Sequence, residues 1–175
     1  YLRVALSLLI DADWTDTACF FQDISLSKRI STERTQEIWK ECIDNFEQYL
    51  EKEIKNNADN GNLLNSFRQE ISDFCRKAAE KDQKLYRLTV PTGAGKTLSS
   101  LRFALYHARK TKKQHIIYIA PFNSILEQNA EEIRKAIGNP SVVLEHHCNV
   151  ICKDEEEEKY RSLTATWDVP IIVTT

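Results

Sequence analysis

A glycine-rich turn between an apolar run and a helical pattern constrains this chain more than any other feature. The turn reads Pro91-Thr92-Gly93-Ala94-Gly95-Lys96-Thr97-Leu98 and follows the apolar segment 88–90. Its glycines let backbone N–H groups close around a polyphosphate, while a lysine can reach the β and γ phosphates and a hydroxyl can ligate Mg²⁺. The strict pattern G-x-x-x-x-G-K-[ST] needs glycine at position 90, where this chain has Val90. The turn therefore predicts a variant phosphate-binding loop, residues 91–98, with Lys96 and Thr97 as candidate catalytic residues. The alternative is a turn that only looks like such a loop.

Apolar runs alternate with helical patterns from residue 85 onwards. The expected strands are Leu85–Val90, His115–Ala120, Val142–Glu145 and Ile171–Thr174, and the expected helices are Lys96–Lys110 and Ser124–Ile137. The runs 115–120 and 171–173 are continuously apolar, as expected of parallel strands covered on both faces. This order predicts an α/β fold with a doubly wound parallel sheet.

Two amphipathic helices are expected before the phosphate loop. In the segment 36–55 the apolar residues recur at spacings of three and four, and so they do again in the segment 64–78. The two stripes consist of Trp39, Ile43, Phe46, Leu50 and Ile54, and of Leu64, Phe67, Ile71, Phe74 and Ala78. The turn-forming residues 56–62 between them indicate a domain boundary.

The first part of the chain has a weaker pattern. Residues 1–10 are mostly apolar, with Leu2, Leu6 and Leu9 on one helical face, which predicts a buried helix that ends in acidic residues. The segment 22–34 is polar and only weakly patterned, and we expect it to be a loop.

Charge and composition narrow the class of protein. The chain has 24 basic and 26 acidic residues and a net charge of −2, so any contact with nucleic acid must be local. Its apolar stretches are far shorter than the roughly 18 residues that cross a bilayer, so we expect a soluble, cytoplasmic protein with no membrane partner. Five scattered cysteines, an odd number, favour reduced thiols over a disulfide framework. The absence of methionine and the final apolar run indicate a piece of a longer protein.

A second candidate site follows the expected strand 115–120. Ser124 and Glu127 form the pattern of a capping box at a helix start, whose free N–H groups would face the carboxyl edge of the sheet. Ligands bind at that edge in open α/β sheets, so this helix start can hold a phosphate of a nucleic-acid backbone. Capping alone is the simpler explanation of the pair. Thr174 and Thr175 are likewise either ordinary strand residues or hydroxyl contacts at the strand's end.

Two groups of residues invite a metal interpretation. Asp11, Asp13 and Asp16 carry carboxylates that suit divalent ions, although a solvated helix end explains their spacing better. The string Glu145-His146-His147-Cys148 with Cys152 fits no common spacing of zinc ligands, and neighbours on a strand point to opposite faces. No zinc site is expected there. The acidic run 154–158 is most simply a solvated helix start.

Taken together, these strings resemble the CRISPR-associated helicase-nuclease of type I systems, a superfamily-2 helicase with an HD-type nuclease domain at its N-terminal side. Residues 88–101 look like its motif I, residues 117–130 look like its motif Ia, and residues 167–175 end at its motif Ib. Residues 7–17 are similar to the closing segment of its HD domain. Several matched strings in the family's order are more specific than any one of them.

The resemblance implies a fold and a division of the chain. Residues 1–34 would be the C-terminal end of an HD-type nuclease domain, residues 35–62 a helical linker, and residues 63–175 part of the first RecA-like helicase domain. ATP and Mg²⁺ would be the cofactors of the loop, with Thr97 as a ligand of the ion. A divalent transition metal would occupy the HD site, with Asp13 as a ligand. Arg68 or Gln69 would approach the adenine.

The resemblance also implies partners and an activity for the parent protein. Pro121, Phe122, Asn123, Ser124, Thr174 and Thr175 would hold single-stranded DNA. ATP turnover would drive translocation along that strand while the nuclease degrades it, in antiviral defence with a CRISPR guide-RNA surveillance complex. The family's early His and His-Asp ligands, its Asp-Glu-x-His box and its second RecA-like domain are not in these 175 residues. The segment by itself is therefore expected neither to hydrolyse ATP usefully nor to cut DNA.

Two other interpretations stay open. One is a different superfamily-2 DNA or RNA helicase, against which the HD-like start at residues 11–17 speaks. The other is a non-catalytic, nucleotide-dependent binding module.

Overall fold

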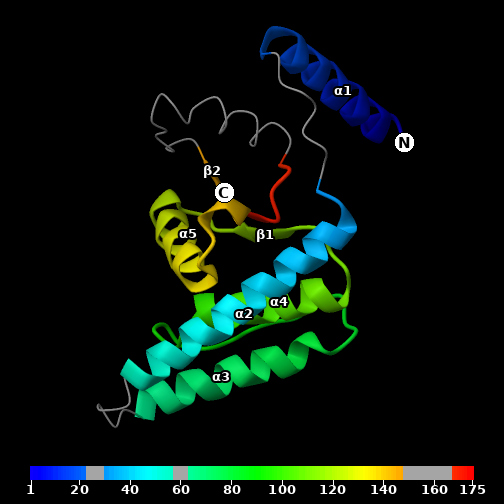
Figure 1. The fold of residues 1–175 in the computed structure, drawn as a ribbon. Helices are drawn as coiled ribbons and strands as arrows, with labels where there is room; N and C mark the ends of the chain where they lie inside the picture. The colour runs from blue at the N-terminus through cyan, green and yellow to red at the C-terminus, as the bar shows by residue number, and fades with distance from the viewer. Residues whose placement is uncertain (23–29, 57–62, 148–166) are drawn as a thin grey trace. The chain divides into compact units, whose positions relative to one another are not determined.

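The computed structural model describes residues 1–22, 30–56, 63–147 and 167–175 (Figure 1). The chain forms two compact units, Tyr1–Ser31 and Thr32–Thr175, and each is described by itself. The predicted boundary segment 56–62 lies, after residue 56, outside the described residues. The division into an HD end, a linker and a RecA-like part stays a prediction.

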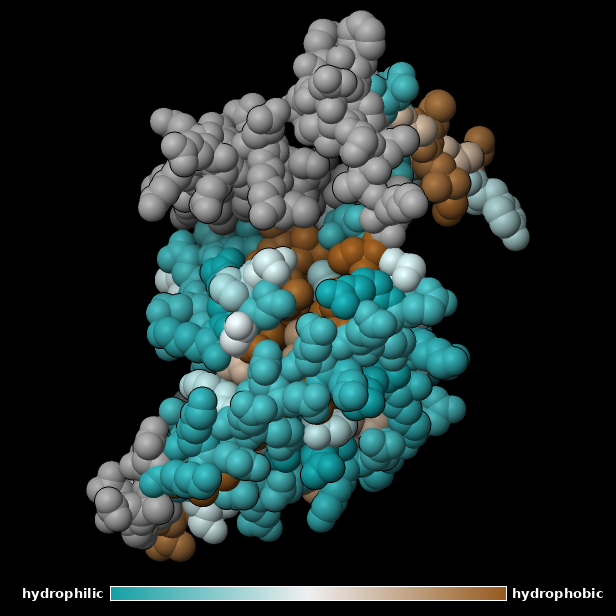
Figure 2. Space-filling view, in the orientation of Figure 1, coloured by the Kyte–Doolittle hydropathy of each residue, from teal (hydrophilic) through white to brown (hydrophobic). Residues whose placement is uncertain are grey.

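Most of the described part of the first unit is the long helix α1 (Leu2–Gln22). It continues through the three aspartates, so the prediction of a helix that ends in acids is wrong. The expectation that its apolar face is buried is wrong within this unit too, because Leu2, Leu6 and Leu9 are all more than half exposed. Figure 2 shows apolar residues on the surface of this helix. Apolar side chains spread around the helix leave no single face to bury.

The described residues of the second unit contain the α-helices α2 (Thr32–Asn56), α3 (Leu63–Ala79), α4 (Lys96–Lys110) and α5 (Asn123–Ile137). Helix α2 lies across α4 and α5 (Figure 1). Its predicted stripe is largely buried, with Trp39 and Phe46 at 0% exposure. Because α2 begins at Thr32, the predicted loop 22–34 is wrong at its end. Two side chains of α2 also satisfy backbone carbonyls, as Trp39 Nε1 donates to Lys113 O at 2.7 Å and Asn45 Nδ2 donates to Ile137 O at 2.9 Å.

The strands β1 (Ile116–Ile119), β2 (Val143–His146) and β3 (Ile171–Thr174) form a parallel sheet in the described part of the chain, in the order β1-β3-β2. A short 3-10 helix, η2 (Pro140–Val142), precedes β2. The central strand β3 is buried along its length, as its continuous apolar run predicts. Edge strand β1 differs, because Ile117 and Ile119 are exposed, and Figure 2 shows apolar residues gathered over this part of the sheet. Burial of β1 on both faces is therefore a wrong prediction.

The predicted strand Leu85–Val90 is also wrong, because this segment makes no pairing with the sheet among the described residues. Side-chain contacts with the helices hold it instead. The Tyr86 ring lies 4.7 Å from that of Phe103 on α4, and the Tyr86 hydroxyl donates to Lys81 O at 2.6 Å. Val90 packs against the buried cluster that includes Ala94 of the loop. The phosphate loop is thus anchored to α3 and α4.

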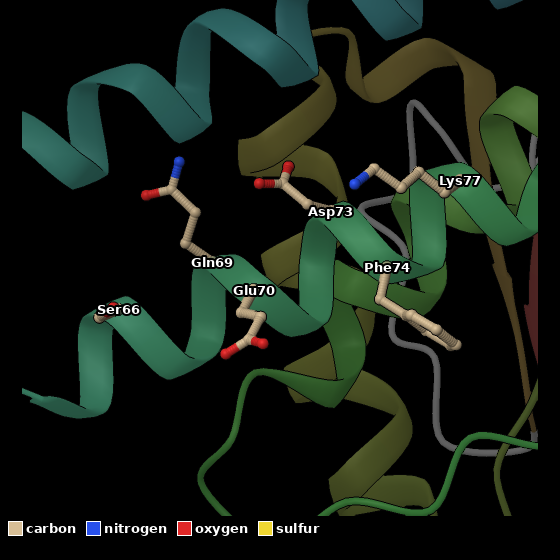
Figure 3. Close-up of a pocket in the computed structure, with 6 residues that line it drawn as sticks. All are labelled: Ser66, Gln69, Glu70, Asp73, Phe74 and Lys77. Carbon is tan, nitrogen blue, oxygen red and sulfur yellow. The ribbon is translucent and has the colours of Figure 1, made fainter.

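The buried face of α3 differs from the predicted stripe. Ile71, Ser72, Cys75 and Ala79 are the buried residues, while Phe67 and Phe74 are 44% and 67% exposed. Helix α3 packs mainly against α4, so the contact surface is the face that includes the small residues. A shallow hollow of about 520 Å³ lies on another face of α3, lined by Ser66, Gln69, Glu70, Asp73, Phe74 and Lys77 (Figure 3). None of the loop residues 91–98 lines it.

Candidate nucleotide-binding site

The phosphate loop leaves the backbone N–H groups at the start of α4 available. Gly93 and Gly95 have φ of +80° and +77°, the left-handed region that favours glycine. Gly95 is the N-cap of α4, and no side chain of the described residues caps it. The first backbone bond of the helix runs from Ser99 N to Gly95 O at 3.0 Å, so the amides of residues 96–98 have no carbonyl four positions earlier in the helix. These donors, at the positive end of the helix dipole, suit an anion.

Lys96 and Thr97 stand at this helix start with different surroundings. Lys96 is exposed, and its ammonium has no hydrogen-bond or ion-pair partner in the described ranges. Thr97 is half-buried, and its Oγ1 donates to Asn129 Oδ1 of α5 at 3.1 Å. Because that bond uses the single hydroxyl hydrogen, the oxygen lone pairs remain for a cation. The residues present therefore fit a polyphosphate with Mg²⁺.

Arg68 of α3 contacts the phosphate loop at Gly93 and Gly95. Its Nε donates to Gly93 O at 2.9 Å, and a Cβ placed on Gly95 would lie 3.6 Å from Arg68 Cγ. A second bond, from Nη1 to Asn65 Oδ1 at 3.4 Å, orients the guanidinium along α3. Arg68 thereby faces the loop's carbonyl side, while an anion would occupy the amide side. An approach of Arg68 or Gln69 to adenine stays a prediction.

A buried arginine connects α4 to the two preceding helices. Arg102 donates to both carboxylate oxygens of Glu47 on α2 at 2.8 and 2.7 Å, and to Asp73 of α3 at 2.7 Å. It also donates to Ser72 Oγ at 3.1 Å, and the Tyr106 hydroxyl donates to Glu47 at 2.9 Å. Burial alone lowers the pKa of Arg102, but the bonds and charges of the two carboxylates outweigh it and raise that pKa overall. The network fixes the helix that carries the phosphate loop.

The carboxyl edge of the sheet brings the second group of predicted residues together. Ala120 N donates to Thr174 O at 3.0 Å, so residues 121–124 begin beside the end of β3. Pro121, Phe122, Ser124 and Thr175 are exposed and Asn123 is half-buried. Thr174 is 9% exposed, and its Oγ1 donates to His146 O at 2.8 Å, so its hydroxyl hydrogen already has an acceptor.

The predicted capping box is wrong. Helix α5 begins at Asn123, and Phe122 is its N-cap, with no side-chain cap bond among the described residues. Ser124 therefore lies inside the first turn, where its hydroxyl is not in the N-cap position. The first turn of α5 nevertheless lies at the sheet edge, and its first intrahelical backbone bond runs from Leu126 N to Phe122 O.

A cluster of polar side chains lies at the end of β2. His147 Nε2 is 2.9 Å from Glu145 Oε1, and Arg134 of α5 pairs with Glu145 Oε2 at 2.8 Å. Trp167 has φ +50°, and its Nε1 donates to His146 Nδ1 at 3.1 Å. Glu145 thus pairs with Arg134 and contacts His147, so local packing accounts for the string Glu145-His146-His147.

The chain matches one known family over most of its length. Residues 40–175, well over half of the chain, match the profile of the family described as the type III restriction enzyme, res subunit. The chain belongs to this family. The match supports a superfamily-2 helicase-like module with ATPase character, to which the loop and the small parallel sheet conform. A comparison with curated proteins finds no match. In the described residues no helix is long and apolar enough to cross a membrane.

In the part of the chain that the structure describes, the candidate metal ligands form no cluster, and two cysteines, Cys42 and Cys75, are free. Asp13 is exposed on α1, and the described residues contain no group of three His, Cys, Asp or Glu side chains that could hold a metal ion. Cys148 and Cys152 lie outside the described residues. Cys42 and Cys75 are free and buried, and burial raises the pKa of the Cys42 thiol to about 12. Reduced thiols are confirmed at these two positions.

Sequence reasoning missed two side chains that organise the site, Arg102 and Asn129. Asn129 did carry a signal, because it is a polar residue within the apolar stripe of α5. Arg102 carried none, since an arginine four residues before Tyr106 on an amphipathic helix is ordinarily exposed.

Proposed function

We propose that this chain is the ATP-binding part of a superfamily-2 helicase that uses ATP turnover to move along single-stranded DNA. The observation that carries the proposal is the start of α4, where left-handed Gly93 and Gly95 precede Lys96 and, among the described residues, no side chain caps the helix or pairs with the lysine. Backbone donors, a free cation and a hydroxyl at one helix start are what a nucleoside triphosphate with Mg²⁺ requires. The family match supports the same module.

The test is equilibrium binding of fluorescently labelled ATP to the full chain. Lys96→Ala should weaken ATP binding at least tenfold, because it removes the cation nearest the terminal phosphates. Lys77→Ala, on the exposed face of α3, is the matched control for loss of one positive charge. Equal affinity of the native chain and the Lys96→Ala variant would refute the phosphate-loop assignment.

The nucleic-acid part of the proposal concerns the carboxyl edge of the sheet. There Pro121, Phe122, Asn123, Ser124 and Thr175 would contact the DNA backbone, with Thr174 beneath them. The exposure of Pro121, Phe122, Ser124 and Thr175 at the start of α5 and the end of β3 supports this role. The already bonded hydroxyl of Thr174 limits it to accepting hydrogen bonds.

A finer proposal assigns the parent protein to the helicase-nucleases of type I CRISPR systems. Sequence resemblance supports it at both ends of the chain. Residues 1–34 would end the HD nuclease domain, 35–62 would be the linker, and 63–175 would be the partial RecA-like domain. The exposed apolar side chains of α1 support its packing within a larger domain. Asp13 would ligate the divalent transition metal, and a guide-RNA surveillance complex would deliver the DNA.

A second candidate is the ATP-dependent subunit of a restriction enzyme, which the description of the matched family favours. The two candidates share the nucleotide site and differ in the nuclease. The reading frame on either side distinguishes them. An upstream His-Asp pair with further histidines, together with a downstream Asp-Glu-x-His, would support the CRISPR helicase-nuclease, and their absence would exclude it.

A further inference from the structure

We propose that Asn129 is a positioning residue for the Mg²⁺ ion of the nucleotide site, acting through the hydroxyl of Thr97. The inference rests on the proposed ATP site and adds a residue on a different helix to it. The observation behind the inference is the hydrogen bond of 3.1 Å from Thr97 Oγ1 on α4 to Asn129 Oδ1 on α5.

Asn129 is buried beside apolar residues of its own helix. It is 8% exposed, and its neighbours on the same face, Leu126, Ala130 and Ile133, are at 0% exposure. An amide in such a place costs free energy unless it is hydrogen-bonded. The Thr97 hydroxyl donates a hydrogen bond to the Asn129 amide, and the same hydroxyl oxygen would ligate the ion.

The direction of this bond matters for metal binding. A threonine hydroxyl has one hydrogen and two lone pairs, and a helical threonine divides between two rotamers because its oxygen can also bond a carbonyl three or four residues earlier. An acceptor on α5 selects one arrangement and directs the hydrogen towards Asn129. The lone pairs of Oγ1 are then left for the ion. Groups that orient a metal ligand in this way typically change metal affinity by about 10- to 100-fold when removed.

The same contact links the two candidate sites. Asn129 lies on the helix whose first residues, Asn123 and Ser124, stand at the sheet edge. A shift of α5 would therefore reach Thr97 through this hydrogen bond as well as through the packing of α5 against α4.

The first measurement is a Mg²⁺ titration of labelled-ATP binding to the full chain. Asn129→Leu has nearly the same size but no acceptor, and it should raise the Mg²⁺ concentration at half-saturation about tenfold. Binding of ATP in excess EDTA should change less than about twofold. Asn129→Asp keeps an acceptor and should retain tight Mg²⁺ binding. In a Thr97→Val background, Asn129→Leu should have no further effect.

The second measurement needs neither nucleotide nor metal. Three-bond NMR couplings report the χ1 angle of Thr97, which should be a single rotamer in the native chain and averaged in Asn129→Leu. Ala130→Gly perturbs the same buried face of α5 but keeps both partners of the Thr97–Asn129 hydrogen bond, and it is the structural control. It should leave the couplings of Thr97 unchanged.

The outcomes separate this inference from the proposed function. The positioning role would be overturned if Asn129→Leu left the Mg²⁺ midpoint unchanged. It would also be overturned if Asn129→Leu weakened ATP binding equally with Mg²⁺ and in EDTA, and Ala130→Gly weakened it by the same amount. Unchanged Thr97 couplings would overturn it as well. Failure of the native chain to bind ATP would refute the proposed function, whereas the rotamer measurement would still test whether Asn129 holds Thr97.

Discussion

Replacing Arg102 with alanine should strongly destabilise the second unit, because three helices share this one buried cation. Its side chain is 7% exposed and donates to two carboxylates and a serine hydroxyl. The variant would leave Glu47 and Asp73 without their shared cation at the contact of α2, α3 and α4. The buried face of α4 would also lose the packing of the arginine stem.

The size of the stability loss depends on how deeply Arg102 and its two carboxylate partners are buried. Breaking a fully buried ion pair costs about 3–5 kcal/mol, because the partner charge stays uncompensated. Here the carboxylates of Glu47 and Asp73 are 30% and 45% exposed, so water can rehydrate them in part. We therefore expect the free energy of unfolding to fall by about 3 kcal/mol, at the lower end of that range.

Urea denaturation followed by circular dichroism measures this loss. With a slope of about 2 kcal/mol per M, the midpoint should shift down by about 1.5 M. The control is Arg34→Ala, which removes the exposed pair Arg34–Glu37 at 57% and 64% side-chain exposure and should cost less than about 0.5 kcal/mol. If the urea midpoint of Arg102→Ala shifts no more than that of Arg34→Ala, the network contributes nothing to stability and the reasoning is refuted.

Two further predictions concern the loop and a buried thiol. Arg68→Ala should weaken ATP binding about fivefold, because about 1 kcal/mol of hydrogen bonding to Gly93 O is lost, and titration beside Lys77→Ala checks it. Equal affinities of these two variants would contradict a supporting role of Arg68. The raised pKa of Cys42, about 12 in the folded chain, means that the unfolded chain ionises this thiol first as pH increases. Below about pH 8.5 the neutral thiol stabilises the folded chain in full, and this stabilisation is lost as the pH rises towards 12. In denaturant titrations over that pH range, the free energy of unfolding should therefore fall more steeply for the native chain than for Cys42→Ala. Parallel pH profiles would contradict this.

Much of the second unit could be predicted from local pattern. The bounds of α4 and β3 agree with the sequence prediction, and α5 begins one residue earlier than predicted. Helix periodicity and continuous apolar runs are properties of neighbouring residues, so the sequence displays them directly. The roles of Lys96 and Thr97 in binding, and those of the residues at the sheet edge, stay predictions.

Several of the wrong predictions concern partners rather than local conformation. The segment Leu85–Val90 was expected to join the sheet, but Tyr86 and Val90 contact helices instead of a neighbouring strand. On α3 the apolar positions Phe67 and Phe74 have the expected spacing, yet the face that includes Ser72 and Cys75 is buried. Which strand pairs and which helix face packs depend on residues far away in the chain, and periodicity does not report them.

The sequence by itself determined the backbone of the phosphate loop. Glycine at positions 93 and 95 permits the left-handed turn, and the helical pattern after it sets the free amides of residues 96–98. Only the tertiary structure decided what holds that loop in place. Arg68 reaches Gly93 across 25 positions of sequence, and Asn129 reaches Thr97 across 32. Those contacts exist because α3 and α5 both pack against α4, and helix packing is decided by the whole core rather than by any one segment.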